Sequence, residues 1–149
     1  MKKDEGLFES WSPIAGWSAI HMTSVMALQH GWTVKGADFD NAFVQAPVDR
    51  DIYIELPAMF RDESGLGQND VCLRLNKSFY GMVDSPRNWW LHVSAGLEHV
   101  GFKPSDNDPG IYFGHGMVLI LYVDDVLLVG PDESKMNKVF QDLKVAGLN

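Results

Sequence analysis

Two adjacent carboxylates lie in the middle of the most apolar stretch of the sequence. The segment "LILYVDDVLLVG" covers residues 119–130 and carries Asp124 and Asp125 at its centre. An Asp-Asp pair can simply be a hairpin bend between two strands, since Asp is a common turn residue. The favoured two-residue hairpin turns contain Gly or Asn, however, and neighbouring carboxylates repel each other. A positively charged partner is therefore expected beside them.

A divalent cation is the partner that best suits this pair. Magnesium binds one or two carboxylates and completes its octahedron with substrate phosphates and water. A third carboxylate is available in "GADFDNAF", residues 36–43, where Asp38 and Asp40 would share one face of a continuous strand. Either residue could complete the site, and either could instead be a solvated residue on an exposed edge strand. Spacing alone does not choose between them.

Strands are expected wherever β-branched and aromatic residues alternate with other residues. The predicted strands are residues 33–43, 51–56, 71–76, 111–113 and 117–129, and the last of these folds back at the two aspartates. The polar, glycine-bearing segment at residues 61–70 is expected to be a loop.

Apolar residues at helical spacing predict three helices. The first runs from Trp17 to His30. In the second, Ser85 is the expected N-cap and Pro86 the first helical residue. The third starts at residues 131–134 and ends at Gly147. This order of elements predicts a single α+β domain in which helices pack on one face of an antiparallel sheet.

The composition bounds the class of protein. A chain of 149 residues suits one domain with its own core. Its net charge of −8 argues against a free-standing nucleic-acid binder, which normally presents a basic face. Cys72 is the only cysteine, so neither an intramolecular disulfide nor a thiolate zinc cluster is expected. The longest apolar stretch is too short to span a membrane, and no signal peptide is recognisable, so we expect an intracellular protein.

Taken together, four ordered segments resemble the reverse transcriptase of copia-type retrotransposons. "YVDD" at residues 122–125 resembles the catalytic hairpin of that family. Further resemblance lies in "ADFDNAFVQAPVDRDIYIELPAMF" at residues 37–60, "VCLRLNKSFYGMVDSPRNWW" at 71–90 and "GFKPSDNDPGIYF" at 101–113. The similarity extends over about residues 8–143.

The resemblance implies a set of catalytic, metal-binding carboxylates. They map onto Asp38, Asp124 and Asp125, and Phe43, five residues after Asp38, favours Asp38 over Asp40. Two magnesium ions, or manganese in their place, would bridge the primer terminus and the incoming triphosphate. Asp38 and Asp124 would hold the ions, with Asp125 in support.

The resemblance also implies substrate contacts. Phe43 resembles the family's steric gate, which leaves no room for a 2′ hydroxyl, although it could instead be a core phenylalanine. The implied nucleotide-binding residues are Phe39, Phe43, Tyr80 and Gly81, and the implied primer- or template-binding residues are Tyr122, Val123, Ser85, Pro86 and Arg87. Trp89 and Trp90 could stack on bases, but helical spacing favours core packing for Trp89.

By this resemblance the chain is an RNA-directed DNA polymerase domain of a Gag-Pol-like polyprotein, acting in the cytoplasm or a virus-like particle. Its partners would be an RNA or DNA template-primer and deoxynucleoside triphosphates. Residues 1–149 would form a palm with partial fingers, lacking the basic N-terminal fingers segment and the thumb, which would explain the acidity. Asp84 departs from the family, whose members usually have a neutral residue there. The alternatives are a non-catalytic palm remnant that acts as a binding module, and a metal-dependent phosphohydrolase.

Overall fold

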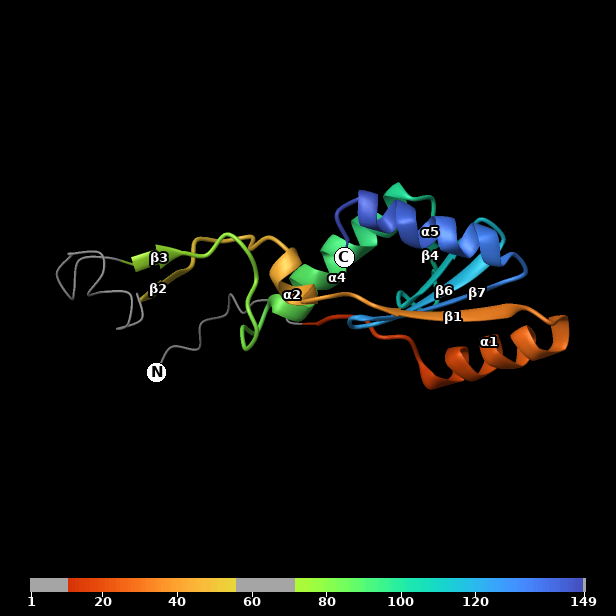
Figure 1. Ribbon diagram of the computed structural model, residues 1–149. Helices are drawn as coiled ribbons and strands as arrows, with labels where there is room; N and C mark the ends of the chain where they lie inside the picture. The colour runs from red at the N-terminus through yellow and green to blue at the C-terminus, as the bar shows by residue number, and fades with distance from the viewer. Residues whose placement is uncertain (1–10, 56–71, 149) are drawn as a thin grey trace.

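The computed structural model describes residues 11–55 and 72–148 (Figure 1). Its centre is a five-stranded antiparallel sheet in the order β1–β7–β6–β5–β4. These strands are β1 (Thr33–Asp38), β4 (Lys103–Pro104), β5 (Ile111–Gly114), β6 (Met117–Tyr122) and β7 (Asp125–Gly130). A separate antiparallel pair, β2 (Tyr53–Glu55) and β3 (Cys72–Arg74), extends away from the main sheet. The expected loop at residues 61–70 lies outside the described residues.

Four helices are present in the described part of the chain. They are α1 (Trp17–His30), the single-turn α2 (Ala42–Gln45), α4 (Ser85–His99) and α5 (Glu133–Val145). The predicted bounds of α1 are confirmed, whereas the predicted strand at residues 33–43 ends at Asp38 and gives way to a turn and α2. None of these helices is both long and apolar enough to cross a membrane.

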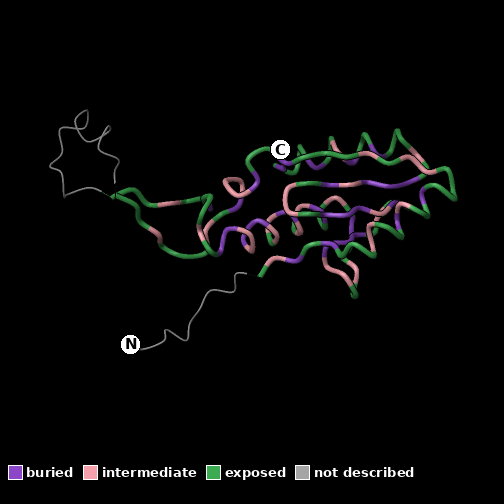
Figure 2. The backbone as a smooth tube through the Cα atoms, turned by 90° about the horizontal axis from the view of Figure 1, so that it is seen from below, coloured by how far each residue is buried: buried purple, intermediate pink, exposed green. Residues whose placement is uncertain are grey.

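The two faces of the sheet follow from strand alternation in β6 and β7. Leu119 and Leu121 of β6, with Val126 and Leu128 of β7, point to one face and are almost fully buried. This face is covered by α4 and α5, whose Trp89, Val93, Leu97, Met136, Val139 and Leu143 complete the main core. Figure 2 shows the buried residues concentrated along these layers.

Helix α1 lies on the opposite face of the sheet (Figure 1). Its Ile20 packs with Ile111 and Ile120 in a second, smaller cluster that includes Leu127. The antiparallel α+β fold is confirmed, but the expectation that the helices share one face is wrong. The physical reason is that β6 and β7 are apolar at consecutive positions, so both of their faces need cover.

Candidate active site

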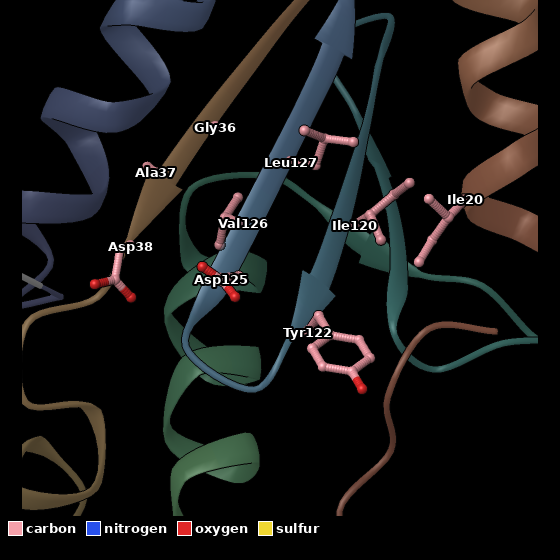
Figure 3. Close-up of a pocket in the computed structure, with 9 residues that line it drawn as sticks. All are labelled: Ile20, Gly36, Ala37, Asp38, Ile120, Tyr122, Asp125, Val126 and Leu127. Atoms are coloured by element: carbon pink, nitrogen blue, oxygen red, sulfur yellow. The ribbon is translucent and has the colours of Figure 1, made fainter. Parts of the chain in front are cut away.

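Asp38 and Asp125 face each other at one end of the sheet. They are paired residues of β1 and β7, and Asp125 is also paired with Tyr122 of β6. Residues directly opposite each other in an antiparallel pair point to the same face. All three side chains are exposed, and Figure 3 shows the two carboxylates side by side at the strand ends. Asp38 and Asp125, which lie far apart in the sequence, are therefore brought together in the fold.

Asp124 lies in the two-residue turn between β6 and β7. It is half-buried, and its carbonyl accepts a 2.9 Å hydrogen bond from the backbone N–H of Phe39, the residue after Asp38. The turn is thus tied to the end of β1. In the described part of the chain, no three His, Cys, Asp or Glu side chains are close enough to form a metal site. The exposed Asp38 and Asp125 carboxylates nevertheless suit magnesium, which takes one or two carboxylates from a protein.

The structure separates the roles of Asp38 and Asp40. Because β1 ends at Asp38, Asp40 falls in the following turn and has no strand partner opposite it. Its carbonyl accepts a hydrogen bond of 2.6 Å from Gln45 Nε2. Asp38 is therefore the residue that this geometry places beside Asp125, in agreement with the choice implied by Phe43.

An open groove of about 530 Å³ lies on the face of the sheet that carries the carboxylates. Asp38 and Asp125 line one end of it, and Ile120 and Leu127 form an apolar floor. Ile20 of α1 lies across from Ile120 (Figure 3). The groove leads directly from the strand ends to α1, so a bound molecule could contact both the carboxylates and an apolar surface.

The candidate nucleotide-binding residues fall into two groups. Phe43 is half-buried and its ring lies 5.0 Å from that of the exposed Tyr80, between centroids, at an interplanar angle of 60°. Gly81, next to Tyr80, has a φ of 91°, which favours glycine. Phe39 differs, because its side chain is buried and packs edge-on against Trp89. Phe39 contacts the candidate site only through its backbone N–H, which donates to the Asp124 carbonyl.

The candidate primer- or template-binding residues at the start of α4 are largely engaged within the protein. Ser85 is buried, and its hydroxyl donates a 2.6 Å hydrogen bond to the Phe79 carbonyl. The predicted N-cap at Ser85 is wrong by one residue, because Asp84 is the N-cap and Ser85 the first helical residue. Pro86 and Arg87 are half-buried, and an Arg87 nitrogen lies 3.6 Å from Asp49. Contacts from these residues to nucleic acid stay a prediction.

Comparison with known proteins gives this geometry its context. Residues 2–146 match the family model described as "Reverse transcriptase (RNA-dependent DNA polymerase)".

The chain belongs to the reverse transcriptase family.

Several of its curated relatives are Pol polyproteins of transposons. The chain is 30% identical over 139 residues to the "Retrovirus-related Pol polyprotein from transposon RE1" of Arabidopsis thaliana, which covers 91% of this chain and 9% of the relative. The chain is 29% identical over 147 residues to the "Retrovirus-related Pol polyprotein from transposon TNT 1-94" of Nicotiana tabacum. This match covers 95% of this chain and 11% of the relative. A "Truncated transposon Ty1-A Gag-Pol polyprotein" of Saccharomyces cerevisiae is 28% identical over 125 residues, covering 83% and 10%.

These relatives confirm the copia-type reverse transcriptase that the motifs predicted. The chain spans only about a tenth of the length of these three polyproteins.

At Asp84 the resemblance predicts a neutral residue, and the structure shows how the charge is accommodated. Asp84 is 3% exposed, and one of its carboxylate oxygens lies 2.9 Å from Arg50 Nε. A buried charge is tolerated when it is paired and hydrogen-bonded. Arg50 therefore balances the charge that Asp84 adds at the start of α4, and the pair joins α4 to the segment that follows α2.

Sequence reasoning missed one contact beneath the candidate active site. The indole Nε1 of Trp89 donates a 2.6 Å hydrogen bond to the carbonyl of Val123, within the "YVDD" turn. The expectation that Trp89 packs in the core is confirmed by its 1% exposure. A buried indole N–H usually finds an acceptor, so the sequence signalled that a partner was needed but not which one.

Proposed function

We propose that this chain is the palm portion of an RNA-directed DNA polymerase, which extends a primer on an RNA or DNA template with deoxynucleoside triphosphates. The observation that carries the proposal is the pairing of Asp38 with Asp125 at the end of the sheet, beside the turn that holds Asp124. In a chain of the reverse transcriptase family, carboxylates converging at one sheet end are suited to bind divalent cations next to nucleotide phosphates.

Divalent metal chemistry is general in this family, and we propose that two magnesium ions, or manganese, are held by Asp38, Asp124 and Asp125. When bound, the ions would stabilise the attacking and leaving oxygens of an in-line displacement at the α-phosphorus. The protein groups would supply charge and position. Asp38 and Asp125 offer exposed carboxylates from neighbouring strands, and the hydrogen bond from Phe39 to Asp124 ties the turn that precedes Asp125 to the end of β1.

The nucleotide sugar would lie against Phe43. The half-buried ring of Phe43 is braced by Tyr80 at a centroid distance of 5.0 Å, so it has limited freedom to move aside for a 2′ hydroxyl. Deoxynucleotides would be preferred for this steric reason. The polyprotein context of the relatives supports a further proposal, that other segments of a Pol-like polyprotein add basic contacts to nucleic acid beside this acidic chain.

Primer extension on an RNA template with magnesium tests the proposal. Asp38→Asn should reduce extension to background, because it removes a charged ligand while keeping the shape of the side chain. Asp40→Asn is the matched control, since Asp40 is an exposed carboxylate two residues away and outside the strand pairing; it should extend primers like the unmodified chain. Equal extension by both variants would refute the assignment. A chain that folds but neither extends primers nor binds manganese would instead be a palm remnant without catalysis.

A further inference from the structure

The turn that carries Asp124 has a backbone conformation that its sequence disfavours. Val123, the first of its two residues, has a φ of 58°. In this left-handed region a β-branched residue is a genuine outlier, because its side chain crowds the backbone. Such a residue persists only where the surrounding structure holds it. Something close to Val123 must therefore supply that restraint.

One buried side chain contacts the turn from beneath. Trp89 of α4 is 1% exposed, and its Nε1 hydrogen bond of 2.6 Å ends on the carbonyl of Val123 itself. The bond therefore fixes the peptide plane between Val123 and Asp124, which sets the backbone direction at Asp124.

The same ring also contacts the segment that carries the other carboxylate. Trp89 and Phe39 pack edge-on, with ring centroids 5.3 Å apart and an interplanar angle of 70°. Phe39 follows Asp38 directly and donates its N–H to the Asp124 carbonyl. Trp89, Phe39 and the turn thus form a closed set of contacts that links the ends of β1, α4 and the hairpin.

We infer that Trp89 is a positioning residue that holds Val123 at positive φ and thereby fixes Asp124 relative to Asp38. Its catalytic meaning rests on the proposed function, but its effect on the turn does not. Core packing alone would require only an aromatic ring at position 89. The indole N–H, which donates to the Val123 carbonyl, goes beyond what packing requires. A phenylalanine would fill most of the same space but could not make this hydrogen bond.

Trp89→Phe tests the inference, with Trp90→Phe as the matched control. Trp90 is the next residue of the same helix, and its buried Nε1 donates to no atom of the hairpin. Two properties are measured on the full chain. The first is the sign of φ at Val123, from NMR backbone chemical shifts and the one-bond Cα–Hα coupling. The second is the affinity for manganese, from calorimetric titration.

We expect Trp89→Phe to lose the positive φ and to bind manganese about three- to tenfold more weakly, because apparent affinity falls with the population of the binding-competent turn. Trp90→Phe should match the unmodified chain in both measurements. Adding Val123→Gly to Trp89→Phe should recover part of the lost affinity, since glycine adopts positive φ without strain. A loss of general packing would not be rescued in this way.

The inference is overturned if Val123 keeps its positive φ in Trp89→Phe, or if the two tryptophan variants bind manganese equally tightly. Failure of the proposed function gives a different result, in which the unmodified chain itself shows no manganese binding that depends on Asp38. In that case the φ of Val123 still decides whether Trp89 holds the turn.

Discussion

The central sheet contains two tight hairpins, and their turns differ in chemistry. Between β5 and β6 the turn residues are His115 and Gly116, both with positive φ, at 55° and 73°. Between β6 and β7 they are Val123 and Asp124, of which only Val123 has positive φ. Those signs match a type I′ turn in the first hairpin and a type II′ turn in the second. Glycine is the usual first residue of a type II′ turn, and here valine takes its place.

The two turns, at opposite ends of the sheet, differ in how well their residues suit their backbone conformation. The His115–Gly116 turn has a glycine where one is favoured, and the His115 ring packs against Phe102 and hydrogen-bonds with the Val100 carbonyl. The Val123–Asp124 turn combines a strained residue with one carboxylate, and a second carboxylate, Asp125, follows at the start of β7. Strained backbone tends to cluster at functional sites, where neighbouring contacts maintain it. One end of the sheet therefore follows local preference, and the other departs from it at the candidate active site.

The largest expected effect is on primer extension, and it comes from removing the carboxylate charge of Asp124 in the turn between β6 and β7. Asp124→Asn should reduce primer extension by about a hundredfold or more, the scale of losing an electrostatic contribution of several kcal/mol. His115→Asn should leave extension unchanged, because asparagine tolerates positive φ and position 115 is remote from the carboxylates. Extension assays at matched protein concentration check both variants. Similar losses in the two would mean that the hairpins do not differ in function.

A second prediction concerns stability at the same two turns. Gly116→Val places a β-branched residue at a φ of 73°, which should lower the free energy of unfolding by about 1–3 kcal/mol. Val123→Gly removes the strain but also removes a half-buried side chain, so its net change should stay within about 1 kcal/mol. Urea denaturation measures both. A larger destabilisation from Val123→Gly than from Gly116→Val would contradict the strain assigned to Val123.

The smallest expected effect is a pH dependence at the helix beneath the strained turn. His92 lies on α4 with its ring 6.0 Å from that of Trp89, and burial, followed by the charge of Lys77, lowers the pKa of His92 below 6.5. The unfolded chain therefore binds a proton at His92 more readily than the folded chain. The contribution of neutral His92 to the free energy of unfolding is fully present above about pH 6.5 and is lost as the pH falls through the folded-state pKa.

His92→Gln should therefore flatten the dependence of unfolding free energy on pH between about 6.5 and the folded-state pKa. Denaturation series at several pH values measure the slope. His99→Gln is the control, because His99 is an exposed histidine at the far end of the same helix. An unchanged slope in His92→Gln would place the acid sensitivity elsewhere.

The sequence predicted the parts of this structure that depend on local pattern. The hairpin around Asp124 and the bounds of α1 follow from periodicity. The resemblance favoured Asp38, which the structure places opposite Asp125, and its role in catalysis stays a prediction. The sequence did not predict the side of the sheet on which α1 packs, because α1 buries little more than Thr23 and Ala27 and leaves Met22 exposed. A helix with so weak a pattern does not indicate which face it covers.

The remaining surprises arise from contacts between distant residues. No local signal distinguishes Asp84 from Ser85 as the N-cap, since both are good capping residues; the Arg50 partner of Asp84 lies well upstream. The same holds for Trp89, whose acceptor at Val123 is fixed only when α4 has packed on the sheet.

Strand β1 is an edge strand whose neighbour in the sheet is β7, formed from a much later part of the chain. During synthesis β1 therefore emerges well before the segment that it pairs with. Pairing between distant segments is slow, because the entropy lost in closing the intervening loop comes before any stabilising contact. The two strands that carry Asp38 and Asp125 can meet only after β7 has been made. Assembly of the acidic pair is thus coupled to completion of the sheet, and a prematurely terminated chain would lack it.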